Sequence, residues 1–150
     1  MNADRKALVE AISRAFAASD YPQGDPISES PNDEGTAEYF RGRSWRDCST
    51  KDLMRHDFAL LAFTPRAFAY FLPAFLVASL DHPKRASNDH VILVLTPPKN
   101  DPRRPSFWSR WSLLTPAQRR VVVDCLRYWG QAEPGTLDAA VTSLQATIDA

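Results

Sequence analysis

The sequence predicts an all-α fold: a single-domain bundle of six or seven helices around one central apolar helix. Residues 67–80 are apolar on almost every side, which is typical of a helix in the middle of a bundle. Helix-capping residues precede several apolar segments, and no two segments make a pair of strands that could form a sheet. With 150 residues, 44% of them hydrophobic, residues 1–150 suit one domain with a sizeable core.

The first part of the chain predicts an amphipathic helix, an acidic loop and a short helix. Residues 3–18 place apolar side chains at helical spacing, namely Leu8, Ile12, Ala15 and Phe16. Residues 20–38 contain three prolines, two glycines and six acidic residues but no Lys or Arg, which indicates an acidic loop. Residues 36–46 predict a short helix that presents Tyr39, Phe40 and Trp45.

The middle of the chain predicts two consecutive helices. Ser49 or Thr50 caps the first helix, over residues 51–62, and an acidic residue lies in its first turn, where the helix dipole favours it. The dipeptide Thr64-Pro65 marks the start of the central helix. Pro73 lies inside that helix and removes one backbone hydrogen bond, so we expect a kink there.

The last part of the chain predicts two or three further helices. The apolar run 91–95 fits either a short strand or a helix, and a helix is favoured because a lone strand leaves its backbone unpaired. Residues 96–106 form a loop rich in proline and arginine. A second Thr-Pro dipeptide opens a helix over residues 116–129. Residues 137–148 again repeat apolar side chains at helical spacing.

The charges balance overall but are segregated along the chain. Eighteen basic and 18 acidic residues argue against nucleic acid as a general partner. Residues 84–120 nevertheless contain eight basic residues and two acidic ones, and aromatic residues are interleaved with them over 99–120. This composition is typical of a single-stranded nucleic-acid groove, unless the aromatic residues pack in the core and the charges are solvated or paired with the acidic loop. The candidate interaction surface consists of Arg103, Arg104, Trp108, Arg110 and Trp111.

No catalytic, nucleotide-binding or metal motif occurs in the sequence, so we predict no cofactor and no metal. Each of the three histidines has an aspartate beside it, but neighbouring residues on a helix do not face each other and define no catalytic pair. An enzyme with an unrecognised pocket near His56 is the alternative to a binding protein. Its candidate pocket residues are Tyr39, Trp45, His56 and Tyr70.

The composition favours the cytoplasm. The first 19 residues lack the apolar run of about 7–15 residues that a secretory signal needs. Cys48 and Cys125 match no metal-ligand spacing, so we expect two reduced thiols, with one long-range disulfide as the alternative. Arg66 and a helix start interrupt the apolar stretch 58–80, which argues against a membrane span.

Three separated segments resemble a bacterial domain family of unknown function. They are T-P-R-A-F-A-Y-F-L-P-A-F at 64–75, L-T-P-P at 95–98 and L-T-P-A-Q-R-R at 114–120. The resemblance covers residues 36–130 and implies a small helical protein of the cytoplasm. It implies no activity, cofactor or catalytic residue.

These observations together favour a non-catalytic module that contacts another protein, of the immunity or accessory type. Catalytic motifs are absent from the sequence, and segregated charge steers the approach of a partner more than it adds affinity.

Overall fold

The described part of the chain is helical. The computed structural model describes residues 2–24, 26–28, 35–56, 59–81, 91, 94–95, 107–130 and 138–149. Within these residues there are eight α-helices, one 3-10 helix and no β-sheet, with a single isolated bridge between Ser28 and Phe63. The all-α prediction is confirmed.

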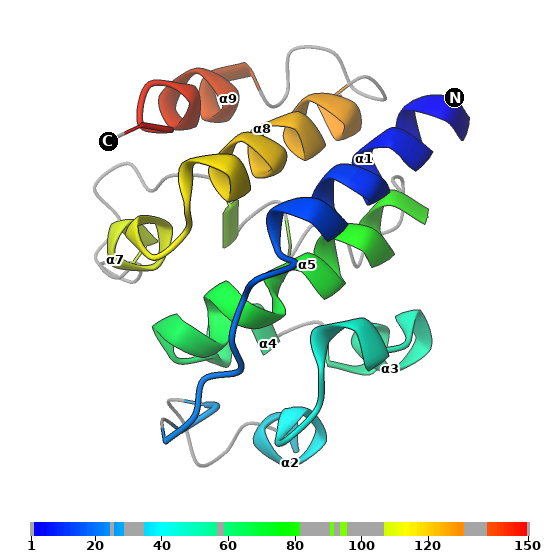
Figure 1. The fold of residues 1–150 in the computed structure, drawn as a ribbon, viewed down its shortest axis with the longest axis vertical. Helices are drawn as coiled ribbons and strands as arrows, with labels where there is room; N and C mark the ends of the chain where they lie inside the picture. Colours follow the sequence, from blue (N-terminus) through cyan, green and yellow to red (C-terminus); the bar gives the residue numbers. More distant parts are fainter. Residues whose placement is uncertain are drawn as a thin grey trace.

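Helix α5 (Pro65–Asp81) lies at the centre of the bundle (Figure 1). It contacts helices on all sides, namely α1 (Asn2–Ala15), α3 (Thr50–Arg55), α7 (Phe107–Ser112), α8 (Pro116–Gly130) and the 3-10 helix Trp45–Asp47. Its buried side chains lie around nearly the whole axis, and Pro73 lies within it. A helix that is apolar all round is stable in water only when other elements cover it. The remaining helices therefore take their positions from α5.

Phenylalanine rings form the part of the core between α5 and the short helix α2 (Thr36–Phe40). The ring centroid of Phe40 lies 5.0 Å from that of Phe63 and 4.8 Å from that of Phe71. Phe63 in turn stacks on Phe71 at 5.4 Å. Aromatic pairs of this kind contribute about 0.5–1.5 kcal/mol beyond the area they bury. They hold α2 against the central helix.

Two helices predicted as continuous are each divided. The segment 51–62 forms α3, capped by the Ser49 hydroxyl as predicted, and then α4 (Ala59–Ala62). The backbone leaves the helix at His56, where the φ and ψ angles are −114° and 40°. The segment 36–46 forms α2, a turn at Gly42 with a φ of 70°, and the start of the 3-10 helix. Helix α7 lies in a segment for which no helix was predicted.

The run 91–95 is helical where the structure describes it. Val91, Val94 and Leu95 have helical backbone and buried side chains, so the strand alternative is not supported. Residues 25 and 29–34 of the acidic loop 20–38, with four of its six acidic side chains, lie outside the described residues, as does the whole Pro/Arg-rich loop 96–106. The hypothesis that these two charged segments pair with each other therefore stays a prediction.

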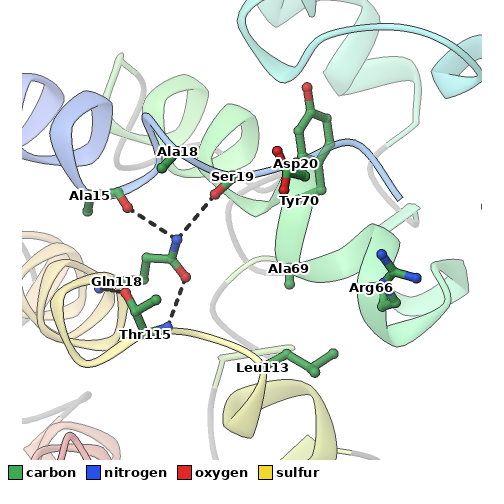
Figure 2. A pocket seen from close by; sticks show the side chains of 10 residues that line it. All are labelled: Ala15, Ala18, Ser19, Asp20, Arg66, Ala69, Tyr70, Leu113, Thr115 and Gln118. Carbon is green, nitrogen blue, oxygen red and sulfur yellow. Dashed lines mark hydrogen bonds between the residues drawn. The ribbon is translucent and has the colours of Figure 1, made fainter. Parts of the chain in front are cut away.

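The start of α8 is fixed by a capping box. The Thr115 hydroxyl accepts a hydrogen bond from the Gln118 backbone N–H at 3.1 Å, and Gln118 Oε1 accepts one from the Thr115 N–H at 3.0 Å. The Nε2 group of Gln118 also donates to the Ala15 carbonyl and to the Ser19 hydroxyl, at 3.1 and 3.2 Å (Figure 2). One buried side chain thus caps α8 and holds the end of α1.

The next residue, Arg119, binds the end of one helix and the turn that follows another. Its guanidinium is buried and donates to the carbonyls of Trp111 and Ser112, which end α7, at 3.1 and 3.2 Å. It also donates to the carbonyls of Thr147 and Ile148, which follow α9 (Asp138–Gln145), at 3.3 and 3.0 Å. The last carbonyls of a helix have no partner within the helix and carry partial negative charge, so a buried cation is stable there.

Replacement of Gln118 by alanine should lower the free energy of unfolding by about 2–3 kcal/mol, because it removes the cap and the hydrogen bonds to two partly buried groups at the end of α1. Thr115→Ala removes only the cap and should cost about 1 kcal/mol. Urea unfolding monitored by circular dichroism measures both. Equal losses for the two variants would contradict the attachment of α1 through Gln118.

Arg119→Met should cost about 3 kcal/mol or more, because it removes charged hydrogen bonds to four carbonyls in the interior. Arg119→Lys should be intermediate, since an ammonium group lacks the planar fork that reaches both helix ends. The neighbouring exposed residue provides the control, and Arg120→Met should change stability by less than about 0.5 kcal/mol. A loss for Arg119→Met no larger than for the control would show that the carbonyl contacts do not stabilise the fold.

Candidate functional site

A cleft of about 310 Å³ opens where α1, α5 and α8 meet (Figure 2). Its lining side chains come from three segments: the end of α1 with the residues just after it, the first turns of α5, and the start of α8 with the residues before it. The central helix positions the second segment, and the capping box positions the other two. The cleft is therefore a consequence of how three helix ends converge.

The cleft combines an apolar surface with two opposite charges. Ala15, Ala69 and Leu113 provide apolar lining, and Leu113 is 46% exposed. Arg66 from α5 and Asp20 from the segment after α1 both line the cleft and are exposed (Figure 2). No described residue forms a hydrogen bond or ion pair with the Asp20 carboxylate.

Three of the lining residues carry a hydroxyl group, and each hydroxyl accepts a hydrogen bond from the protein. The hydroxyls of Ser19 and Thr115 accept from Gln118, and the hydroxyl of Tyr70 accepts from the Trp45 N–H at 3.4 Å. A hydroxyl has one hydrogen to donate in addition to its acceptor positions. None of the three donates that hydrogen to a residue in the described ranges. Each is therefore a fixed oxygen with a donor available.

The four residues predicted to form a pocket near His56 form two separate pairs. The ring of Tyr39 stacks on that of His56, with 5.0 Å between centroids and 25° between planes. Trp45 and Tyr70 are the second pair, joined by the backbone hydrogen bond just described. Tyr70 lines the cleft at the ends of α1, α5 and α8, whereas Tyr39, Trp45 and His56 do not.

Tyr39 of this pair makes further polar contacts that were not predicted from the sequence. The Tyr39 hydroxyl donates to Asp52 Oδ2 at 3.1 Å, and the Arg43 guanidinium lies 4.1 Å from the centre of the Tyr39 ring. Burial, followed by the bond to Asp52, raises the pKa of Tyr39. The same bond, together with Ser49, lowers the pKa of Asp52. Tyr39 therefore stays protonated as a donor and Asp52 stays ionised as its acceptor.

Both cysteines are free thiols in the structure. Burial raises the pKa of Cys48 to about 11, so the thiolate is scarce at neutral pH. The fully buried Cys125 also has its pKa raised by burial. Neither residue has the lowered pKa of an activated nucleophile.

The candidate basic and aromatic surface is only partly exposed. Trp108 is 44% exposed, whereas Arg110 and Trp111 are buried. Arg110 Nη2 donates to the Phe63 carbonyl at 2.6 Å, and Trp111 Nε1 donates to the Thr147 hydroxyl at 2.8 Å. Arg103 and Arg104 lie outside the described residues. Arg110 and Trp111 therefore hold α7 in the fold instead of facing a ligand, which corrects their place in the predicted surface.

Sequence reasoning missed the cleft. It treated Arg66 as an obstacle to membrane insertion and Asp20 as one of six acids in a loop. The spacing of Thr115 and Gln118, three residues apart at a helix start, is a capping-box pattern and could have indicated that Gln118 is structural.

The described residues contain neither a membrane-spanning helix nor a group of metal ligands. None of their helices has the length and apolar character needed to cross a membrane. Among them, no three His, Cys, Asp or Glu side chains lie together as a metal ion would require.

The described residues thus define a helical bundle with a charged cleft at three helix ends. The chain belongs to the Family of unknown function (DUF6714), whose model matches residues 5–146. The match extends beyond the three segments that carry the sequence resemblance and includes most of α1 and all of α9. No curated protein and no solved structure matches the chain significantly.

Substitution of Tyr39 by phenylalanine should raise the pKa of Asp52 toward its ordinary value of 3.8, because the phenolic donor is lost. In the wild type the pKa of Asp52 is lower in the folded than in the unfolded state, so its contribution to stability is present above the unfolded pKa and is lost as the pH falls through the folded one. Y39F should therefore lose less stability on acidification than the wild type.

NMR titration of the Asp52 carboxyl carbon, with urea unfolding over the acidic range, measures both effects. Tyr128→Phe, which removes a hydroxyl from α8, is the control and should leave the Asp52 titration unchanged. An unchanged curve in Y39F would show that the hydrogen bond does not form in solution.

Proposed function

We propose that this protein is a non-catalytic interaction module of the bacterial cytoplasm, of the immunity or accessory type, and that it contacts a partner protein through the surface around Trp108. The observation that carries this proposal is the exposure of Trp108, which is 44% accessible although Phe107 and Trp111 of the same short helix are buried. Tryptophan is enriched among the residues that contribute most to protein–protein affinity.

The position of the Trp108 ring also supports a binding role. The ring makes an edge-on contact with the buried ring of Phe107 at 4.9 Å, and α7 itself is held by Arg119 at its C-terminal end. An exposed ring on a supported helix loses little conformational entropy when it binds. Its indole offers a large apolar area together with one hydrogen-bond donor.

A non-catalytic role is supported by the partners and protonation states of the ionisable side chains. The Tyr39 hydroxyl and Asp52 are paired with each other, and the raised pKa of Cys48 keeps its thiol protonated. Two free cysteines suit a reducing compartment such as the cytoplasm.

Site-specific photo-crosslinking in the native host identifies the partner. A photoreactive amino acid at position 108 should capture one protein in good yield, whereas the same group at position 61 should not. Leu61 is a matched control because it is 45% exposed on a different helix, α4. Equal capture at both positions would contradict the proposed surface.

With the purified partner, Trp108→Ala should weaken binding by about 30-fold or more, the effect of removing a dominant interface residue. Leu61→Ala should bind as the wild type does. Calorimetric titration measures both affinities. An unchanged affinity for Trp108→Ala would overturn the proposal.

A further inference from the structure

We propose that the partner protein of the Trp108 surface also inserts an arginine side chain into the cleft at the ends of α1, α5 and α8, where the Asp20 carboxylate binds it. This inference rests on the proposed partner contact and names the chemistry of the partner: an apolar segment that covers α7, with an arginine beside it. It depends on the continuity of two exposed surfaces and on the charge and lining of the cleft.

The exposed face of α7 extends from Trp108 to the edge of the cleft. Trp108, Ser109 and Ser112 are exposed on this helix, and Leu113, which follows it, is 46% exposed and also lines the cleft. The Leu113 N–H donates to the Arg110 carbonyl at 3.1 Å, so the helical turn continues through this residue. Five residues of helix span about 7.5 Å, and a standard interface buries about 800 Å² on each side. A partner that covers Trp108 therefore reaches the cleft.

This exposed face of α7 carries no charge. Arg110 is the only ionisable residue of the helix, and it is buried. The central part of a protein interface is depleted in charged residues, so the face suits an uncharged, apolar segment of the partner. Charged side chains are found next to it, in the cleft, where Asp20 and Arg66 are exposed.

Asp20 is the cleft residue whose charge is available to a partner. It lines the cleft, and no residue in the described ranges forms a hydrogen bond or an ion pair with its carboxylate (Figure 2). Arg66, in contrast, already interacts within the protein. A guanidinium group donates two parallel hydrogen bonds to a carboxylate, which favours arginine over lysine as the residue that Asp20 binds.

The lining of the cleft suits an arginine side chain. Ala15, Ala69 and Leu113 provide an apolar surface for its aliphatic stem. The two hydroxyls that accept from Gln118 each keep a second acceptor position, which an N–H of the guanidinium can use. The volume of about 310 Å³ is at the lower end of the range of about 300–1,000 Å³ for pockets that enclose a whole ligand, and it accommodates one side chain.

NMR titration of the labelled protein tests the cleft without the partner. N-acetyl-arginine amide, an arginine without terminal charges, should shift the amide signals of residues 18–20 with a Kd of about 10 mM or tighter. N-acetyl-citrulline amide has nearly the same shape but no charge, and it should bind about fivefold more weakly. In Asp20→Asn the two probes should bind alike. Equal binding of both probes to the wild type, or no shift with the arginine probe, would overturn the proposal.

Photo-crosslinking at position 18 tests whether the partner enters the cleft. Ala18 is exposed and lines the cleft (Figure 2). A photoreactive amino acid there should capture the same protein as one at position 108, on a peptide that contains an arginine. Capture at position 108 but not at position 18 would overturn this inference and leave the proposed function intact. Failure of capture at position 108 would overturn both.

With the purified partner, Asp20→Asn should weaken binding about tenfold. Replacement of the captured arginine by glutamine should weaken binding of the wild type by the same factor and have no further effect on Asp20→Asn. Calorimetric titration of the four pairs measures this coupling, and additive losses would overturn the proposal.

Two further variants assign the sign of the charge. Glu10→Gln is the control, because Glu10 is exposed on α1 and does not line the cleft, and it should bind as the wild type does. Arg66→Gln should tighten binding about twofold, because it removes a like charge from the cleft. Thermal unfolding checks that each variant is folded. A loss of affinity for Arg66→Gln with none for Asp20→Asn would show that the partner presents an acid, and would overturn the proposal.

Discussion

The fold depends on two adjacent buried side chains at the start of α8, Gln118 and Arg119. Neighbouring residues on a helix point in different directions, so the two side chains reach different parts of the molecule. Gln118 satisfies the first turn of its own helix and the end of α1, and Arg119 satisfies the end of α7 and the segment after α9. Backbone groups at helix ends are the ones that a bundle leaves without partners. Two residues therefore resolve this problem for α1, α7 and α8, and they also satisfy carbonyls of the turn after α9.

Both candidate sites are supported by the same pair of residues. Gln118 fixes the hydroxyls of Ser19 and Thr115 in the cleft, and Arg119 holds α7, which presents Trp108. The chemistry of the two sites is nevertheless different. The cleft offers charges and hydroxyl donors, whereas the surface of α7 offers an aromatic ring. They suit different side chains while sharing one structural support.

The sequence predicts the helices that depend on residues close together in the chain. It misses the features that depend on contacts between residues far apart in the chain. The Thr-Pro starts of α5 and α8 and the apolar character of α5 depend on adjacent residues, and both helices occur as predicted. His56, where the helix breaks, stacks on Tyr39, 17 positions away in sequence, and the last carbonyls of α7 bind Arg119. Arg110 looked like a surface base, but its partner is the carbonyl of Phe63 from another part of the chain.

The position of the cleft follows from the composition of α5. A central helix without a polar face must be covered along its length, so the ends of the covering helices meet over it. Helix ends bring capping hydroxyls and amides with them, as Thr115 and Gln118 do here. In an apolar bundle, polar groups with fixed geometry therefore collect where helix ends meet. Asp20 and Arg66 add charge at such a point, which explains why charged and polar side chains line a cleft whose central helix is almost entirely apolar.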